Sequence, residues 1–302
     1  MDGVLIIDKP EGITSHDVVN RVRRILGTKR VGHTGTLDPF ATGVLVILVG
    51  KATRLAQFID KDEKEYAATV AFGYRTDTGD RTGERQGEEE TRRREELTAE
   101  IVEEVLGRFR GQIKQVPPMY SAKKVAGKKL YELARKGEEV ERRPVSVNIS
   151  KLEIEEEYLA SDAESETWDL KLTVRCSAGT YIRTLAEDIG KAIGVGAHLK
   201  ELRRTHAGRF SLEQASTLEQ LEQNSDPASL LLPMEAAVEH LPEFRLVENR
   251  VAATLNGMST RVSSDEWQAG DLVRITSPDG ELVAIGIFDA TENSVRPKVV
   301  LG

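Results

Sequence analysis

The chain has 302 residues, a formal net charge of −8 and the composition of a soluble globular protein. That length suggests about two domains, and no apolar run approaches the ~18 residues that a membrane helix needs. The apolar residues 4–7 are too few for a signal peptide and lack a basic leader. The single cysteine, Cys176, excludes an internal disulfide, and the five histidines show no zinc-ligand spacing. We therefore expect a cytoplasmic protein with no metal and no membrane association.

The first residues predict a strand followed by a helix. Gly3–Lys9 is a short apolar strand that ends at Pro10. Thr14 and Asp17 have the spacing of a capping box, in which each side chain bonds the other residue's backbone N–H. The helix that begins there is expected to run to Gly27.

Residues 31–45 read Val-Gly-His-Thr-Gly-Thr-Leu-Asp-Pro-Phe-Ala-Thr-Gly-Val-Leu and predict a bent loop without regular structure. Glycine permits positive φ, and Pro39 drives the preceding residue into an extended conformation. The loop displays one carboxylate, Asp38, beside one imidazole, His33, and residues 44–49 follow as a buried strand. A loop carboxylate is most often a turn residue, so a catalytic role for Asp38 needs partners elsewhere in the chain.

Four elements are expected next, over Lys51–Ile59 (helix), Lys64–Gly73 (strand, with Tyr66 near its start), Tyr74–Gly83 (loop) and Thr98–Phe109 (amphipathic helix). Between them, the charged segment 84–96 includes the run Glu88–Glu96. That run predicts an exposed helix or a disordered insert, and we assign it no function.

Basic residues are concentrated in one part of the chain. Arg108 to Lys151 holds twelve Lys or Arg and four acids, whereas residues 152–169 hold eight acids and no base. Phosphate attraction is local because salt screens it beyond ~10 Å, so this segment suits RNA despite the negative net charge. Its lysines lie between two tyrosines, in the order Tyr120, Lys123, Lys124, Lys128, Lys129 and Tyr131. This interleaving is typical of a nucleic-acid surface, and a basic amphipathic helix ending at Gly137 is the alternative.

Val145–Tyr158 and Glu166–Cys176 alternate as the two strands of a hairpin. After Gly179 a helix is expected over Tyr181–Ile193, with Arg183 in its first turn. The helix dipole does not favour a cation at that end, so Arg183 indicates an anionic partner nearby.

The remaining elements are expected over His198–Arg204, Gly208–Leu212, Gly270–Ile275, Glu281–Phe288 and Lys298–Leu301 (strands) and Glu248–Leu255 (helix). The change to short strands separated by Gly, Asp and Pro turns indicates a small β-rich domain. We place the boundary in the Leu230–Pro242 linker, which divides the chain into residues 1–234 and 235–302.

Three residues could act together on a nucleobase. An aspartate nucleophile must be ionised and held in line, and a guanidinium beside it keeps its pKa low and binds it bidentately. An enzyme that works on a base must unstack it and supply an aromatic surface in compensation. Asp38, Arg183 and Tyr66 are the candidates for these roles.

These residues lie in motifs that resemble the TruB family of bacterial tRNA pseudouridine synthases, which isomerise a T-loop uridine (conventional tRNA position 55). The motifs span nearly the whole chain and are Asp8-Lys9-Pro10, Gly32 to Gly43, Lys64-Glu65-Tyr66, Thr76 to Asp80, Pro117 to Lys123, Gly179 to Thr184 and Leu202-Arg203-Arg204. The resemblance implies an α+β fold, with a mixed or antiparallel sheet flanked by helices and a small C-terminal PUA-like β-barrel that binds RNA. It also implies a thumb-like RNA-binding insertion at about 117–143.

The resemblance further implies that Asp38 attacks either ribose C1′ or base C6, and the sequence leaves both open. Arg183 pairs with Asp38, while Tyr66 stacks on the flipped uracil and helps to move the C5 proton. Other residues implied to contact the base or the RNA are His33, Tyr181 and Leu202, with weaker contacts from Lys123, Lys124, Lys128, Lys129, Arg203 and Arg204. The Lys9-Pro10 pair is implied to be structural.

The expected partner is the T-stem and loop of tRNA, with no cofactor, no obligate protein partner and a monomeric chain. One alternative is an RNA chaperone in which isomerisation is secondary, and another is a guide-RNA-dependent synthase. The thumb-like segment and short C-terminus favour the stand-alone type. An aspartyl phosphatase is disfavoured, because it needs a second acid where this chain has Phe40.

Overall fold

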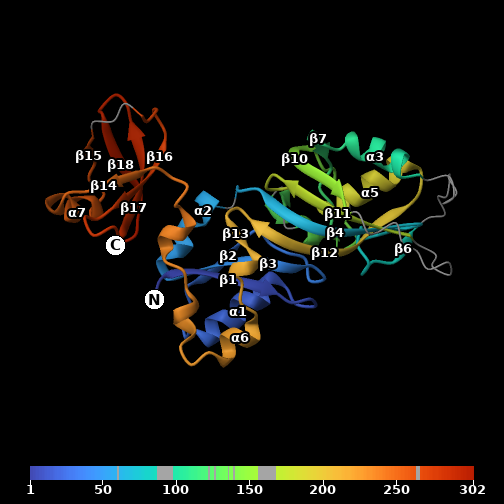
Figure 1. The fold of residues 1–302 in the computed structure, drawn as a ribbon, viewed down its shortest axis with the longest axis horizontal. Coiled ribbons are helices and arrows are strands. Elements are labelled where there is room, and N and C mark those ends of the chain that lie inside the picture. The colour runs from blue at the N-terminus through green and yellow to red at the C-terminus, as the bar shows by residue number, and fades with distance from the viewer. Residues whose placement is uncertain are drawn as a thin grey trace.

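A computed structural model describes residues 1–59, 61–86, 98–121, 123–125, 127–134, 136–138, 140–155, 168–262 and 266–302. They form an α+β protein with one large mixed sheet and a smaller C-terminal sheet (Figure 1). The large sheet has the order β1-β3-β12-β4-β11-β10-β7, with β2 paired to β3 and β13 to β12. Its strands are β1 (Gly3–Lys9), β2 (Val31–Thr34), β3 (Thr42–Val49), β4 (Lys64–Phe72), β7 (Gly111–Gln115), β10 (Val145–Ile154), β11 (Trp168–Cys176), β12 (Ala197–Ala207) and β13 (Phe210–Ser211).

The described helices are α1 (Ser15–Ile25), α2 (Ala56–Ile59), α3 (Ala99–Gly107), α4 (Leu130–Ala134), α5 (Ile182–Ile193), α6 (Leu218–Gln223) and α7 (Glu248–Leu255), with 3-10 turns η1 (Gly50–Leu55), η3 (Leu212–Gln214), η4 (Pro227–Leu230) and η5 (Met234–Ala237). Two small hairpins are β5 (Arg75–Thr76) with β6 (Arg85–Gln86), and β8 (Lys124–Val125) with β9 (Lys128–Lys129). None of the helices in the described ranges has the length and apolar composition that crossing a bilayer would require.

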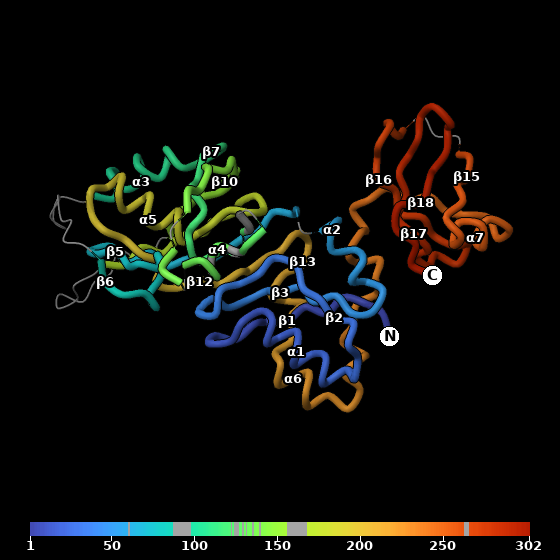
Figure 2. The backbone as a smooth tube through the Cα atoms, turned by 180° about the vertical axis from the view of Figure 1, so that it is seen from behind, coloured from blue at the N-terminus to red at the C-terminus, as the bar shows by residue number. Residues whose placement is uncertain are grey.

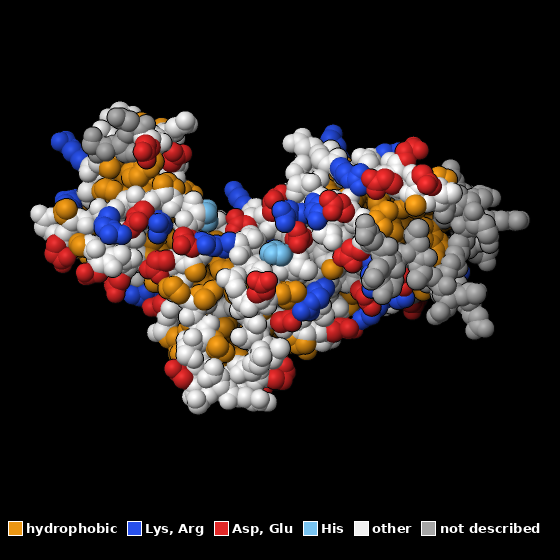
Figure 3. All heavy atoms as spheres, in the orientation of Figure 1, with side chains coloured by type: hydrophobic (Ala, Val, Ile, Leu, Met, Phe, Trp, Pro, Cys, Tyr) orange, Lys and Arg blue, Asp and Glu red, His pale blue; other side chains and the backbone are white. Residues whose placement is uncertain are grey.

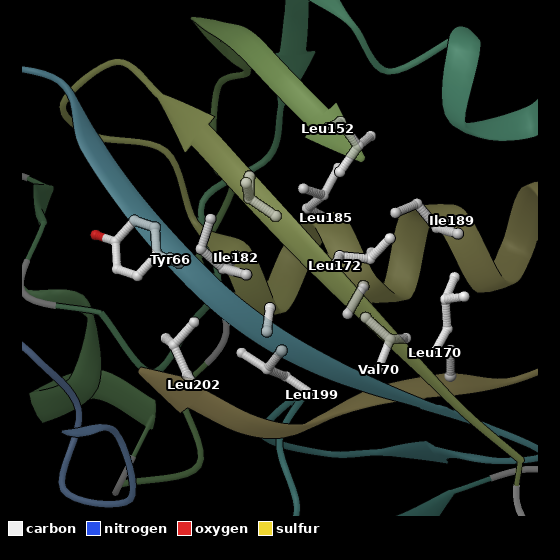
Figure 4. Close-up of a cluster of buried hydrophobic side chains, with 14 of the residues drawn as sticks. Tyr66, Val70, Leu152, Leu170, Leu172, Ile182, Leu185, Ile189, Leu199 and Leu202 are labelled. Atoms are coloured by element: carbon white, nitrogen blue, oxygen red, sulfur yellow. The ribbon is translucent and has the colours of Figure 1, made fainter. Parts of the chain in front are cut away.

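Helices cover the two halves of the large sheet separately. Helices α3 and α5 pack on the half that contains β4, β11 and β10, where Leu185 and Ile189 meet Leu172 (Figure 4). Helices α1 and α6 lie together beside β1 and β3, with Val18 and Leu218 in one apolar cluster (Figure 2). The halves meet where β12 runs parallel to β3 and antiparallel to β4. The chain leading into β3 at this seam is the Asp38 loop.

The C-terminal sheet has the order β14-β16-β17-β18-β15, and its strands are β14 (Glu243–Arg245), β15 (Thr260–Arg261), β16 (Leu272–Thr276), β17 (Leu282–Asp289) and β18 (Ser294–Val300). It lies at the opposite end of the molecule from α3 and β6 (Figures 1 and 2). Ile285 and Val299 share an apolar cluster with Val4 and Phe58, so this sheet is anchored on the β1–β3 half. The surface is hollowed between this unit and the rest of the molecule (Figure 3).

Most predicted elements are confirmed. Thr14 and Asp17 form the capping box of α1, Thr98 caps α3, and β10 pairs with β11 as a hairpin. The predicted C-terminal helix has the bounds of α7. Local periodicity and capping carry these predictions because each depends on residues close together in the chain.

Several expectations differ from the structure. Residues 31–45 contain β2 and the start of β3, because the segment pairs along β3 from Val31 opposite Val49. Residues 51–59 form η1 and α2 rather than one α-helix. The last strand begins at Ser294, since Pro297 lies at a register shift where its missing N–H is tolerated. The run Glu88–Glu96 and the turn between β10 and β11 lie outside the described residues.

Lys9 is a buried cation at the end of β1. Its side chain is fully buried, and Nζ donates to the carbonyl oxygens of Pro10 (2.9 Å), Pro39 (3.2 Å) and Ala41 (2.7 Å). Burial lowers the pKa of Lys9 to about 8, although the Asp38 carboxylate opposes the shift. The structural role implied for Lys9 agrees with these bonds, which tie Pro39 and Ala41 of the Asp38 loop to the end of β1.

Replacing Lys9 by methionine should lower the free energy of unfolding by about 2–4 kcal/mol at neutral pH, because three carbonyl oxygens lose their donor. Urea denaturation measures this change. The exposed Lys29 supplies a matched control, and Lys29→Met should change stability by less than about 0.5 kcal/mol.

A comparison of the wild type with Lys9→Met at several pH values tests the lowered pKa of Lys9. Between about pH 8 and 10.5 the unfolded chain binds the Lys9 proton more tightly than the folded chain does. Wild-type stability relative to Lys9→Met should therefore rise with pH in this window, by at most about 1.4 kcal/mol per pH unit. If the stability difference between the wild type and Lys9→Met became smaller as pH rises, the lowered pKa of Lys9 would be contradicted.

Candidate active site

A cavity of about 280 Å³ lies between the loop after β2 and the start of α5. Its described lining residues include Gly35, Thr36, Leu37, Asp38, Lys64, Tyr66, Ser121, Ser177, Gly179, Tyr181, Ile182, Arg183, Leu202 and Arg204. The fold thus brings together five residues singled out in the sequence for base chemistry: Asp38, Tyr66, Tyr181, Arg183 and Leu202. They come from a loop, two strands and a helix start.

Arg183 binds Asp38 through two nitrogens. Its Nε lies 3.0 Å from Asp38 Oδ2, and its Nη2 donates to Asp38 Oδ1 at 3.3 Å. The arginine side chain is only 6% exposed, whereas that of the aspartate is 36% exposed. The buried arginine therefore fixes the orientation of the carboxylate, which remains open to the cavity, as an attacking group requires.

Further contacts fix the arginine itself. Arg183 Nη1 donates to the Thr78 carbonyl (2.9 Å) and lies 3.5 Å from Asp80 Oδ2, and Nη2 donates to the Tyr120 carbonyl (2.6 Å). These bonds confirm that the cation in the first turn of α5 has anionic partners. The sequence analysis assigned no role to Asp80, although its motif, with Thr78 and Thr82 around an aspartate, contains both hydroxyls that bind its carboxylate.

The pKa of Asp38 is raised above its ordinary value, and the expectation of a low pKa was wrong. Burial raises it, Arg183 lowers it, and the neighbouring carboxylate of Asp80 raises it further. Removing water disfavours the charged form by more than a single guanidinium restores. Asp38 is thus held in its ionised form less firmly than the sequence suggested.

The Asp38 loop is fastened to the first helix. Ser15 Oγ donates to the Leu37 carbonyl (3.0 Å), and the Leu37 N–H donates to the same hydroxyl (2.9 Å). The Gly12 N–H donates to the Pro39 carbonyl (2.8 Å), and the Ala41 N–H to the Asp38 carbonyl (3.1 Å). Together with Lys9, these bonds leave the backbone around Asp38 little freedom.

Arg204 does not occupy the surface position expected of an RNA contact. It is 1% exposed, and it donates from Nε to the Val44 carbonyl and from Nη2 to the Gly35 carbonyl, both at 2.7 Å. Gly35 (φ 63°) and Gly43 (φ 100°) pack against it, and a Cβ on Gly43 would lie 2.2 Å from the Arg204 carbonyl oxygen. Arg204 therefore holds the Asp38 loop through carbonyls other than those that Lys9 binds.

Tyr66 projects from β4 and forms an apolar wall with Ile182 and Leu202 (Figure 4). Its phenol is hydrogen-bonded to Arg204, and burial raises its pKa above the ordinary value. The ring therefore stays a neutral phenol at physiological pH. Leu202 is 8% exposed, which suits both packing and contact with a planar ligand.

Tyr181 is placed by a residue that the sequence analysis missed. The fully buried Gln115 at the end of β7 accepts from the Tyr181 N–H (3.1 Å) and donates to its carbonyl (3.3 Å). A glutamine before two prolines carried no recognisable signal in the sequence, because this contact joins positions 66 residues apart.

Two of the remaining predicted RNA contacts, His33 and Arg203, do not line the cavity in the described part of the chain. His33 lies in β2 with Nε2 3.2 Å from Thr36 Oγ1, and it is not among the described residues that line the cavity. Arg203 makes a bidentate pair with Asp8 at 3.0 and 2.8 Å. The four predicted lysines belong to the segment around β8 and β9, where the backbones of Lys124 and Lys129 lie opposite each other in the two-stranded sheet.

Cys176 is buried, and burial raises the pKa of its thiol to about 11. It is therefore a thiol at neutral pH and a poor nucleophile. No group of three or more His, Cys, Asp or Glu side chains in the described ranges is arranged to hold a metal ion.

A partly exposed aspartate held by a buried arginine lines the same cavity as the Tyr66 ring, and this set of side chains suits an enzyme that acts on a planar base. The description "TruB family pseudouridylate synthase (N terminal domain)" belongs to a family model that matches residues 23–182, and a "tRNA pseudouridylate synthase B C-terminal domain" model matches residues 183–239. The chain belongs to the TruB family of pseudouridylate synthases and is an isomerase.

Relatives and solved structures agree with this assignment. The chain is 47% identical to tRNA pseudouridine synthase B of Solibacter usitatus, over 100% of both chains. It is 40% identical to the Bacillus subtilis protein of the same name, over 100% of this chain and 98% of the relative. Two similar structures are a Cbf5-Nop10-Gar1 complex (TM-score 0.74, 31% identity) and an H/ACA RNP bound to a substrate RNA containing 2′-deoxyuridine (0.73, 30%). Each match covers 99% of this chain and 85% of the chain in the solved structure.

The raised pKa of Asp38 predicts that Asp38→Asn is at least as stable as the wild type at pH 7. Between the ordinary and the raised pKa the folded state holds more protons, so stability falls as pH rises through that window. The stability advantage of Asp38→Asn over the wild type should disappear at about pH 4 and below. Urea denaturation at both pH values measures it, with the exposed Asp226→Asn as control. A loss above about 1 kcal/mol at pH 7 would show instead that the Arg183 pair is net stabilising.

Proposed function

We propose that this enzyme isomerises a uridine in the T-loop of tRNA to pseudouridine, with Asp38 as the nucleophile. The observation that carries the proposal is the bidentate pair of Arg183 with Asp38 at the wall of a cavity bordered by Tyr66. The relatives named tRNA pseudouridine synthase B support tRNA as the substrate.

In this proposal the target uridine leaves the base stack and enters the cavity. The Tyr66 ring stacks on the uracil, and Leu202 and Tyr181 border it. The carboxylate of Asp38 attacks either C1′ or C6, and both routes remain open. The N1–C1′ bond breaks, the base turns and a C5–C1′ bond forms. C5 then loses its proton, N1 takes one up and Asp38 is released, so the product is an isomer of the substrate.

Each side chain has a separate role. Arg183 orients the carboxylate and offsets its charge, while the raised pKa of Asp38 makes its ionised form a stronger nucleophile when it is present. The pKa of Tyr66 is also raised, so its hydroxyl relays the C5 proton rather than removing it as a phenolate.

RNA contacts outside the cavity complete the proposal. We assign the catalytic part to residues 1–234, with the basic insertion at about 117–143 as a thumb that grips the T-loop. His33, in β2, is proposed as a further contact to the RNA. Residues 235–302, which contain the five-stranded C-terminal sheet, are proposed as a PUA-like RNA-binding domain. Arg203 is a weaker candidate for an RNA contact because the Asp8 carboxylate already neutralises its charge.

A guide-RNA-dependent synthase is the second candidate, since the similar Cbf5 structures belong to multi-component complexes. Full-length identity of 47% to a relative named tRNA pseudouridine synthase B favours the stand-alone type. Reaction with unmodified tRNA, with no other RNA or protein added, separates the two. Product outside the T-loop, or none without an added RNA, would contradict the proposal.

The Asp38→Asn variant tests the nucleophile and the chaperone alternative together. It should bind tRNA within about threefold of wild type but form pseudouridine more than ~10³-fold more slowly, because the covalent step is lost. Single-turnover tritium release from C5-labelled tRNA measures the rate, and Asp226→Asn should keep it. A wild-type rate for Asp38→Asn would show that another group attacks.

Salt dependence tests the basic insertion. A logarithmic plot of tRNA affinity against salt should have a slope of about −0.7 for each phosphate contacted on single-stranded RNA. Lys123→Ala with Lys128→Ala should make it shallower by about 0.7 for each lysine that meets a phosphate. Lys191→Ala, exposed at the far end of α5, should leave it unchanged. An identical slope for the double variant would remove the insertion from the interface.

A further inference from the structure

Ser121 carries a buried hydroxyl in the wall of the Asp38 cavity. The residue is 6% exposed, and its Oγ has no hydrogen-bond partner among the residues that the structure describes. A desolvated hydroxyl without a partner costs about 1–3 kcal/mol, and most buried polar groups in proteins avoid this cost. An unpartnered hydroxyl in a reaction cavity therefore indicates that the partner is a ligand.

The position of Ser121 relative to the ion pair is well defined. The carbonyl of the preceding residue, Tyr120, accepts from Arg183 Nη2 at 2.6 Å. That same nitrogen donates to Asp38 Oδ1 at 3.3 Å. Ser121 thus directly follows the residue whose carbonyl binds the Arg183 guanidinium, and a turn bond from its N–H to the Met119 carbonyl (3.0 Å) holds its backbone.

Two other buried hydroxyls in the described ranges also lack partners, those of Thr184 in α5 and Thr254 in α7. Neither belongs to the described lining of the cavity. Thr254, in the C-terminal unit, provides a control remote from the reaction.

We propose that Ser121 is a substrate-binding residue whose hydroxyl bonds the 2′-hydroxyl or the uracil O2 of the flipped uridine. The inference rests on the proposed function, in which Asp38 reacts at C1′ or C6. Both candidate partners are attached close to C1′, on the ribose and on the base. A serine hydroxyl both donates and accepts, and Ser121 belongs to the wall of the cavity that receives the base.

The Ser121→Ala variant separates substrate binding from a structural role. Its single-turnover rate on tRNA should fall about 5- to 10-fold, as expected for one lost hydrogen bond. Its urea midpoint should stay the same or rise, because the variant removes an unsatisfied polar group. Thr254→Val should likewise keep or raise the midpoint and leave the rate unchanged. An unaltered rate for Ser121→Ala, or a rate loss accompanied by a lower midpoint, would overturn the inference.

Two modified substrates identify the atom bound. If the partner is the 2′-hydroxyl, Ser121→Ala should slow the enzyme on tRNA with 2-thiouridine at the target but not on tRNA with 2′-deoxyuridine there. If the partner is O2, the pattern should be reversed. Equal slowing on both substrates would overturn a bond to either group. Failure of the wild type to form pseudouridine in tRNA would overturn the proposed function itself, whereas equal rates for wild type and Ser121→Ala would overturn only this inference.

Discussion

Two buried cations hold the reactive loop in place. A bent loop at a sheet seam turns its carbonyl oxygens inward, and each would be left without water or a partner. Lys9 takes those of Pro39 and Ala41, and Arg204 takes those of Gly35 and Val44. Asp38 lies between these two anchors. The position of the carboxylate therefore depends on two cations whose own side chains are buried.

The site itself is assembled around a third cation. Arg183 joins the Asp38 loop, the Asp80 turn and the carbonyl of Tyr120 at the start of the basic insertion. Movement of the insertion on binding RNA would therefore be felt at the nucleophile. The same burial that orders these contacts raises the pKa of Asp38, so the ionised carboxylate is less stable here than it would be in water.

Much of the architecture follows from local patterns. The capping box at Thr14, the alternation in β4 and the amphipathic α7 each depend on neighbours a few residues away, so the sequence predicts them well. The pairing of residues 31–34 with β3 depends on a strand edge left open by the fold, and local pattern did not indicate it. The Asp38–Arg183 pairing was inferred correctly, because a cation at a helix start requires an anion and the family motifs named which one.

The sequence by itself predicted the main strands and helices of the core, the family, and the meeting of Asp38, Tyr66 and Arg183 in one site. Only the tertiary structure decided that Arg204 is an internal anchor, that Gln115 positions Tyr181 and that the pKa of Asp38 is raised. The physical reason is common to all three. Burial and hydrogen bonding between distant segments depend on which groups lose water together, and residue type does not reveal that until the chain has folded.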